Sequence, residues 1–79
     1  MGRQSIAEQR RIQIGRALQA CMLEKGSYES TSVKDIAQRA DMAAGLIHHY
    51  FKSKDEILML VARMLFESIR NDIDELYLA

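Results

Sequence analysis

The segment TSVKDIAQRADMAAGLIHHYFKSKDEIL, residues 31–58, decides the fold of this chain. Ser32 is followed three residues later by Asp35, which is an acidic form of the capping box that begins helices. Apolar side chains then recur at i, i+3, i+4 and i+7, the spacing of one helix face. These side chains are Val33, Ile36, Ala37 and Ala40. The pattern predicts a short helix that ends near residue 40.

A second short helix is predicted immediately after this one, over about residues 43–50, with a tight turn at residues 41–42. Two short helices joined by such a turn form a helix-turn-helix, and the small side chain of Ala37 lets the two helices cross closely. The outer face of the second helix is then available to enter a DNA major groove. The inward positions of this helix are Ile47, Tyr50 and Phe51.

A longer helix is expected before this pair, from about Ser5 to Lys25, with Gly26 as its stop signal. The loop that follows holds Tyr28, which we expect to anchor the loop in the core. The apolar stripe of the helix consists of Ile14, Ala17, Leu18, Cys21 and Met22.

A fourth helix is expected to run from residue 54 to the end of the chain, with Ser53 and Glu56 as a second capping box. At about 1.5 Å per residue it would be roughly 35 Å long, too long to be covered by three short helices. Its apolar stripe consists of Ile57, Leu58, Val61, Met64, Leu65, Ile69, Ile73 and Leu76. The predicted fold class is therefore all-α, with no strand signal and no internal repeat.

Composition agrees with one small globular domain. The chain has 79 residues, of which 48% are apolar and 28% are charged, and it contains no proline. A single cysteine, Cys21, excludes an internal disulfide and fits a reducing cytoplasm. No apolar run approaches the length of a membrane span.

Charge is distributed unevenly although the net charge is zero. Residues 1–54 contain nine Lys or Arg against five Asp or Glu, whereas residues 55–79 contain two against six. The first part of the chain can therefore face a polyanion, and the second part cannot. The alternative is that both parts are ordinary solvated faces.

The residues from Thr31 to Leu58 resemble the DNA-binding region of the TetR family of bacterial repressors. The shared features are Thr-Ser before the first short helix, "IA" followed by "A" on it, and G-x-I-x-x-Y-F leading into K-S-K. The upstream "EKG" and the helix after "KDE" also match, so the resemblance covers almost the whole chain. The chain departs from the family pattern at Asp41, where Gly is usual, at Ala43, where Ser or Thr is frequent, and at His48, where Tyr is usual. The loop "SYES" is also one residue longer than is typical.

The resemblance implies a tri-helical DNA-binding domain at residues 1–54, with the helix-turn-helix at about 33–52. It implies that residues 55–79 form a helix linking to a larger helical domain that is absent from these residues. It also implies a regulator of transcription, expected to be a repressor, that acts as a homodimer on a palindromic operator. The absent domain would bind a small-molecule inducer and hold the dimer together. No cofactor is implied.

The start of the second short helix is expected to lie against DNA. None of its side chains can form a bidentate hydrogen bond to a base, so direct readout should be sparse and DNA shape should matter. Ala44 and Leu46 can touch thymine methyl groups, and Gly45 permits close approach of the backbone. The residues of this segment are Ala43, Ala44, Gly45 and Leu46.

Phosphate contacts are expected at the starts of the other helices. Lys54 offers a charge beside the first amides of the fourth helix, and Thr31 and Ser32 stand at the start of the short first helix of the pair. For each of these residues, a purely structural capping role is the alternative. Three arginines near the start of the chain are candidates for a neighbouring backbone or minor-groove contact, namely Arg3, Arg10 and Arg11.

The pair His48 and His49 has several interpretations. Adjacent helical residues point about 100° apart, so the two side chains do not form the i, i+4 pair that binds a metal. A catalytic role would need an oriented partner and a pocket, and the sequence shows neither. Ordinary exposure to solvent is a further alternative. We expect both histidines to lie on the DNA side, with Tyr50 packing its ring inward and directing its hydroxyl toward a phosphate.

Two other classes of function compete with DNA binding. The first is a helical protein-interaction module that uses the long fourth helix as a groove ligand or dimer seam. The second is an enzyme, which the sequence disfavours because it shows no acid–base or nucleophile arrangement.

Overall fold

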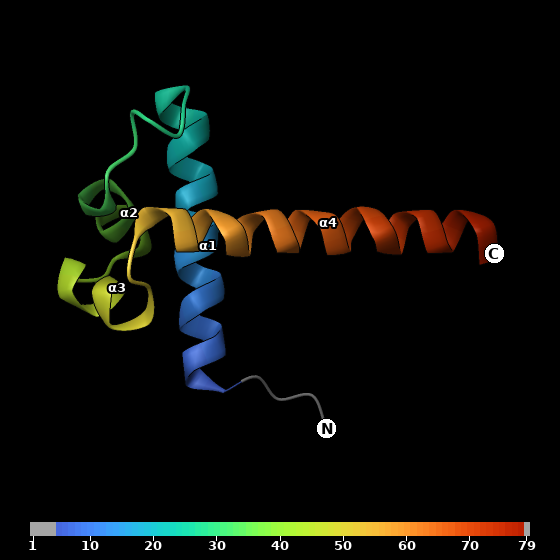
Figure 1. Cartoon of the computed structure of the whole chain (residues 1–79), viewed down its shortest axis with the longest axis horizontal. Coiled ribbons are helices and arrows are strands. Elements are labelled where there is room, and N and C mark those ends of the chain that lie inside the picture. The colour runs from blue at the N-terminus through green and yellow to red at the C-terminus, as the bar shows by residue number, and fades with distance from the viewer. Residues whose placement is uncertain (1–4, 79) are drawn as a thin grey trace.

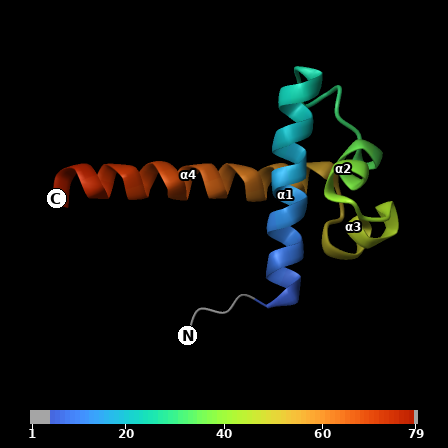
Figure 2. The same ribbon diagram turned by 180° about the vertical axis from the view of Figure 1, so that it is seen from behind.

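The computed structural model describes residues 5–78 of the chain, without the side chain of residue 78. The described part contains four helices, α1 (Ile6–Lys25), α2 (Val33–Ala40), α3 (Ala44–Tyr50) and α4 (Lys54–Leu78). Helix α4 begins beside α2 and α3, crosses the middle of α1 at a steep angle, and then extends away from the other helices (Figures 1 and 2). The predicted all-α fold class is confirmed.

Helix α1 begins and ends with the signals that its sequence contains. The Ser5 hydroxyl accepts a hydrogen bond from the Glu8 amide at 3.1 Å. Gly26 adopts the left-handed conformation with φ 86°, and its amide donates to the Met22 carbonyl. The predicted apolar stripe is confirmed, because Ile14, Ala17, Leu18 and Cys21 are buried and Met22 is half-buried.

Helix α2 carries the predicted capping box. The Asp35 amide donates to the Ser32 hydroxyl at 3.1 Å, and the Ser32 amide donates to the Asp35 carboxylate at 2.9 Å. The helix ends where Asp41 takes the left-handed conformation, with φ 57° and ψ 47°. The Met42 amide then donates to the Ala37 carbonyl and the Asp41 amide to the Gln38 carbonyl. These two bonds form a Schellman motif, which satisfies the carbonyls left over at the helix end.

The second predicted capping box, at the start of α4, is wrong in one half. The Ser53 hydroxyl does accept from the Glu56 amide at 3.3 Å. The Glu56 carboxylate, however, accepts from the Lys52 amide at 2.9 Å, one residue earlier than a capping box requires.

The core lies where α1, α2, α3 and the first two turns of α4 meet. Its centre consists of branched apolar side chains with no more than 1% of their surface exposed. Burial of each such side chain stabilises the fold by about 1.5–3 kcal/mol. These side chains are Ile14, Leu18, Ile36, Ile47, Ile57 and Val61.

Polar contacts fix α1 against the helix-turn-helix. The Gln13 side-chain amide donates to the Ala40 carbonyl at 2.9 Å, which joins α1 to the last residue of α2. Lys25 lies 3.5 Å from the Asp35 carboxylate, and Arg39 forms an ion pair with Glu24. Because the side chains of these ion pairs are between 25% and 53% exposed, the buried apolar contacts contribute more to stability than they do.

Helix α4 changes character along its length. Ile57 and Val61 are buried in the core, so the packed unit extends at least to Val61. Beyond it lies the distal part of α4, residues 65–78, in which the described apolar side chains of residues 65–77 have between 47% and 84% of their surface exposed. These side chains are Leu65, Phe66, Ile69, Ile73, Leu76 and Tyr77. The domain division that we predict at residue 54 remains a prediction.

Candidate nucleic-acid interface

The outer face of α3 is exposed and is supported from behind by the core. Ile47 has 1% and Phe51 has 7% of its surface exposed, and these two residues fix the inner side of the helix. The outer side consists of small residues followed by two histidines. The exposed residues are Ala43, Ala44, Gly45, His48 and His49.

Gly45 is not required by packing inside the protein. A Cβ atom built on Gly45 would meet no heavy atom within 4 Å. The residue is exposed and lies in the first turn of α3. Because Gly45 has no side chain, a smooth patch of backbone lies between Ala44 and the half-buried Leu46. Another molecule can approach the backbone of α3 closely at this patch.

Helix α3 begins without a side-chain cap. Ala43 occupies the cap position and forms no side-chain hydrogen bond. The amide of Leu46 compensates in part by donating to the Ala43 carbonyl at 3.0 Å. The other amides of the first turn are open to a partner outside the helix.

The two histidines lie at the carboxyl end of α3, beside Tyr50. The His49 and Tyr50 rings meet edge to face, with centroids 5.1 Å apart and planes at 83°. The Arg11 guanidinium of α1 lies 5.5 Å from the centroid of the Tyr50 ring. The half-buried Tyr50 thus links α1 to α3, and both histidines are exposed. Among residues 5–78, no group of three or more histidine, cysteine or acidic side chains is placed to hold a metal ion.

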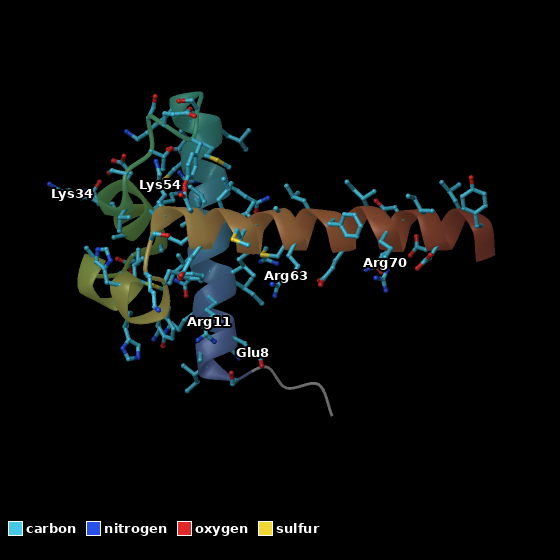
Figure 3. The ribbon with its side chains drawn as sticks, in the orientation of Figure 1. Glu8, Arg11, Lys34, Lys54, Arg63 and Arg70 are labelled. Atoms are coloured by element: carbon cyan, nitrogen blue, oxygen red, sulfur yellow. The ribbon has the colours of Figure 1, made fainter. Side chains whose placement is uncertain are left out.

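A second exposed group lies at the start of α2. Ser32 is exposed, with its amide and hydroxyl engaged in the capping box. Lys34, the second residue of α2, is exposed and points away from the body of the protein (Figure 3). Lys34 is not among the contact residues predicted from the sequence, although a cation in the first turn of a capped helix is a usable signal for one. Lys52, between α3 and α4, is also exposed.

Thr31 is placed differently from our expectation. Only 1% of its surface is exposed, and its hydroxyl donates to the Ser27 carbonyl at 3.1 Å. The side chain therefore lies inside the fold and not on the exposed surface. Neighbouring side chains of an extended segment point to opposite sides, so the Ser32 side chain points outward to cap α2 and the Thr31 side chain points inward.

Lys54 is also directed toward the protein. Its ammonium group donates to the Tyr28 carbonyl at 2.9 Å and to the Thr31 carbonyl at 2.8 Å. The same nitrogen lies 4.0 Å from the centroid of the Tyr28 ring. The lysine thus connects the first residue of α4 to the loop before α2.

Tyr28 is the other half of this connection. It is half-buried against the core, as predicted, and its hydroxyl donates to the Asp55 carboxylate. Burial, reinforced by the hydrogen bond to Asp55, raises the pKa of Tyr28 to about 12. The phenol is therefore neutral and remains a donor to Asp55 at neutral pH.

Of the three candidate arginines near the start of the chain, two lie within the described residues. Arg10 and Arg11 lie exposed on the first half of α1, and Arg11 is near α3 through Tyr50. Arg3 lies outside the described residues.

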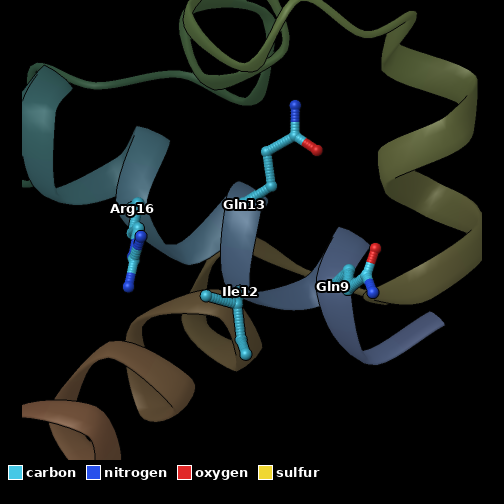
Figure 4. A pocket seen from close by; sticks show the side chains of 4 residues that line it. All are labelled: Gln9, Ile12, Gln13 and Arg16. Atoms are coloured by element: carbon cyan, nitrogen blue, oxygen red, sulfur yellow. The ribbon is translucent and has the colours of Figure 1, made fainter. Parts of the chain in front are cut away.

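One surface hollow lies along α1 and is lined by Gln9, Ile12, Gln13 and Arg16 (Figure 4). Its lining contains two amides, one guanidinium and one apolar side chain. Gln13 is already bonded to the Ala40 carbonyl. These four side chains include no nucleophile with an adjacent base, so they do not form the arrangement that nucleophilic catalysis requires.

The four-helix arrangement and the exposed face of α3 define a helix-turn-helix DNA-binding protein. Residues 20–61 match the profile of the family described as bacterial regulatory proteins, tetR family. This match covers more than half of the chain, and the chain belongs to the TetR family. It carries the DNA-binding helix-turn-helix of that family of transcriptional regulators.

Three relatives are HTH-type transcriptional regulators. The chain is 33% identical over 76 residues to PksA of Bacillus subtilis, covering 96% of the chain and 37% of PksA. It is 35% identical over 68 residues to HbdR of Aromatoleum sp., covering 86% of the chain and 29% of HbdR. It is 38% identical over 55 residues to the repressor KstR of Mycolicibacterium smegmatis, covering 70% of the chain and 27% of KstR.

The chain therefore spans less than two fifths of the length of these relatives. No solved structure gives a significant match to it. In the part of the chain that the structure describes, no helix is both long and apolar enough to cross a membrane.

Proposed function

We propose that this chain is the operator-binding part of a ligand-responsive transcriptional repressor that acts as a dimer on a palindromic operator. The observation that carries the proposal is the exposed outer face of α3, held outward by the buried Ile47 and Phe51. A helix presented in this way can enter the major groove, while the helix before it crosses the backbone.

In this proposal α3 reads DNA through a small number of direct contacts. The smooth patch around Gly45 approaches the base edges closely, with Ala44 and Leu46 against thymine methyl groups. His48 and His49 donate to phosphates or base edges, and the Tyr50 hydroxyl donates to a phosphate. Because few side chains of α3 can discriminate bases, DNA shape supplies part of the specificity.

Phosphate contacts are proposed at the edges of this face. Ser32 and the first amides of α2 meet one backbone, with Lys34 supplying the charge, and Ala43 brings the open amides of α3 toward another. Thr31 and Lys54 are not among the proposed DNA contacts, because both side chains donate hydrogen bonds to backbone carbonyls of the protein. We propose that they support the interface instead.

Two such units must stand about 34 Å apart, or a multiple of this, to read successive major grooves on one face of DNA. We propose that a region outside these residues covers the exposed apolar side chains of the distal part of α4, holds the dimer and binds a small-molecule inducer. The greater length of the relatives and the description of KstR as a repressor support this proposal. The proposed location is the cytoplasm, where the reduced Cys21 thiol is stable.

Selection of bound duplexes from random DNA with the intact protein tests the proposal. We expect enrichment of an inverted repeat, and a loss of preference at one base pair of each half-site when His49 is replaced by alanine. Enrichment of no sequence would contradict the proposed function.

The exposed distal part of α4 also favours a second candidate, a protein-interaction module without a DNA role. The two candidates differ in the salt dependence of DNA binding. A DNA-binding protein should lose affinity steeply as salt rises, and Lys34→Met should reduce the slope of log affinity against log salt by about one unit. Arg70→Met, on the distal part of α4 (Figure 3), is the matched control and should leave the slope unchanged. A protein that binds no duplex even at low salt would support the interaction module.

A further inference from the structure

Four residues from two segments form a closed set of contacts between the loop before α2 and the start of α4. We call this set, Tyr28, Thr31, Lys54 and Asp55, the loop latch. Lys54 donates to the backbone carbonyls of Tyr28 and Thr31, at 2.9 and 2.8 Å. The Tyr28 ring lies under the ammonium group, and the Tyr28 hydroxyl donates to Asp55. The first two residues of α4 thus engage both ends of a four-residue loop segment.

The position of the loop latch gives it a consequence for the DNA-binding face. Thr31 directly precedes Ser32, the cap of α2, and Lys54 directly follows Ser53, whose hydroxyl caps α4. The Thr31 amide also donates to the Tyr28 carbonyl at 3.0 Å, so this carbonyl accepts from both the loop and α4. With Thr31 buried, a shift of the loop relative to α4 would move the start of α2.

The protein itself engages the charge of Lys54. An ammonium group has three protons, and carbonyl oxygens accept two of those of Lys54. The ring face 4.0 Å away adds a cation–π attraction. A phosphate would have to compete with all three partners, whereas Lys34 is exposed and points outward.

We propose that Lys54 is a positioning residue for DNA binding, which fixes the start of α2 relative to α4 through the loop latch and does not contact phosphate. This inference rests on the proposed function, because its readout is operator affinity.

A double-mutant cycle in the intact protein tests the loop latch. Lys54→Met removes the charge and all three proton donors at similar side-chain length, and Tyr28→Leu removes the ring while Lys54 stays charged. If the two residues act as one unit, each change should weaken binding to the selected operator by roughly tenfold. The double variant should then be within about twofold of the weaker single variant.

The salt dependence separates positioning from phosphate contact. Lys54→Met should leave the slope of log affinity against log salt within about half a unit of wild type, whereas Lys34→Met should lower it by about one unit. Amide hydrogen exchange should show lost protection at residues 28–33 in both Lys54→Met and Tyr28→Leu. Tyr28→Phe keeps the ring, so it should retain operator affinity close to wild type.

Three results would overturn the inference. A slope lowered by about one unit in Lys54→Met, with normal affinity in Tyr28→Leu, would identify a phosphate contact. Additive losses in the double variant would show that the two residues act separately. Unchanged affinity in both single variants would remove the loop latch from DNA binding.

Misfolding of a variant and failure of the proposed function can both be distinguished from failure of the loop latch. If Lys54→Met or Tyr28→Leu does not fold, Lys54→Gln and Tyr28→His form a milder cycle, in which additive losses again contradict the loop latch. Failure of the wild-type protein to bind any selected duplex would contradict the proposed function, whereas additive losses in a wild-type protein that binds would contradict only the loop latch.

Discussion

Asp41 holds the turn of the helix-turn-helix in a conformation that favours glycine. Its φ of 57° and ψ of 47° lie in the left-handed region. Aspartate tolerates this region better than most residues but still at some cost. The sequence predicted this tension, because the family pattern has glycine here and the chain does not.

Two replacements of Asp41 should therefore change the free energy of unfolding in opposite directions. Asp41→Gly should raise the free energy of unfolding by about 0.5–1 kcal/mol, since glycine adopts the left-handed region without steric cost. Asp41→Val should lower it by about 1–2 kcal/mol, because a β-branched residue is strained there. Urea unfolding of both variants provides the measurement, and equal effects in the two would contradict the assigned strain.

Asp35 links the capping box of α2 to pH. The hydrogen bond from the Ser32 amide, followed by that involving the Ser32 hydroxyl, holds the pKa of Asp35 below its ordinary 3.8. A group whose pKa is lower in the folded state stabilises the fold above the unfolded pKa. This stabilisation is lost as the pH falls from 3.8 through the lower folded value.

We therefore expect Asp35→Asn to weaken the loss of stability in acid. The unfolding midpoint should fall less between about pH 6 and pH 2.5 in this variant than in wild type, because one carboxylate no longer takes up a proton. Asp74→Asn, on the exposed distal part of α4, is the control. An equal fall in wild type and Asp35→Asn would show that the capping box does not contribute to acid sensitivity.

At the scale of elements, the crossing of α1 and α4 requires a small residue at the position of Gly15. A Cβ atom at Gly15 would lie 3.4 Å from the Leu60 side chain, 3.5 Å from Met64 and 3.6 Å from Val61. These are ordinary contact distances, so one methyl group fits the crossing but a larger side chain does not.

Gly15→Ala should accordingly stabilise the protein, because glycine within a helix costs about 0.5–1 kcal/mol relative to alanine. Gly15→Leu should destabilise it by about 1–3 kcal/mol, since the added atoms would force α1 and α4 apart. Thermal unfolding of the two variants tests the crossing. Destabilisation by alanine would mean that the helices approach more closely than these distances indicate.

The elements were largely predictable because their signals are local. Ser32 with Asp35 marked the start of α2, and Gly26 marked the end of α1. The half-formed box at Glu56 was not predictable, because a glutamate reaches more than one amide and only the tertiary path of the chain selects among them. The long-range contact from Gln13 to the Ala40 carbonyl likewise leaves no local pattern.

The candidate site was less predictable than the fold for the same reason. Periodicity placed Ile47 inside and the histidines outside, and the structure agrees. The inward direction of Lys54 depends on carbonyls of a loop that lies 23 or more residues away. That of Thr31 depends on the Ser27 carbonyl, four residues earlier in the same loop. A sequence pattern shows that a cation stands at a helix start but not which oxygen it selects.

At the scale of the whole molecule, one end is a packed unit and the other is a long helix with an exposed apolar face (Figure 1). The net positive part of the chain, residues 1–54, contains α1, α2 and α3, which form the packed unit with the start of α4. The distal part of α4 belongs to the net negative part. Charge and shape therefore assign the DNA-facing role to the same end of the molecule.

The central claim is that the outer face of α3 meets DNA, and Gly45→Ala tests it most directly. Because a Cβ at Gly45 meets nothing inside the protein, alanine should leave the free energy of unfolding unchanged or raise it by up to about 1 kcal/mol. The same methyl group would stand between α3 and the base edges, so affinity for the selected operator should fall by about tenfold or more. Unfolding and operator binding should be measured on the same preparation of the intact protein. A more stable variant with weakened binding is the result that we predict, and unchanged operator affinity in a folded Gly45→Ala protein would contradict the claim.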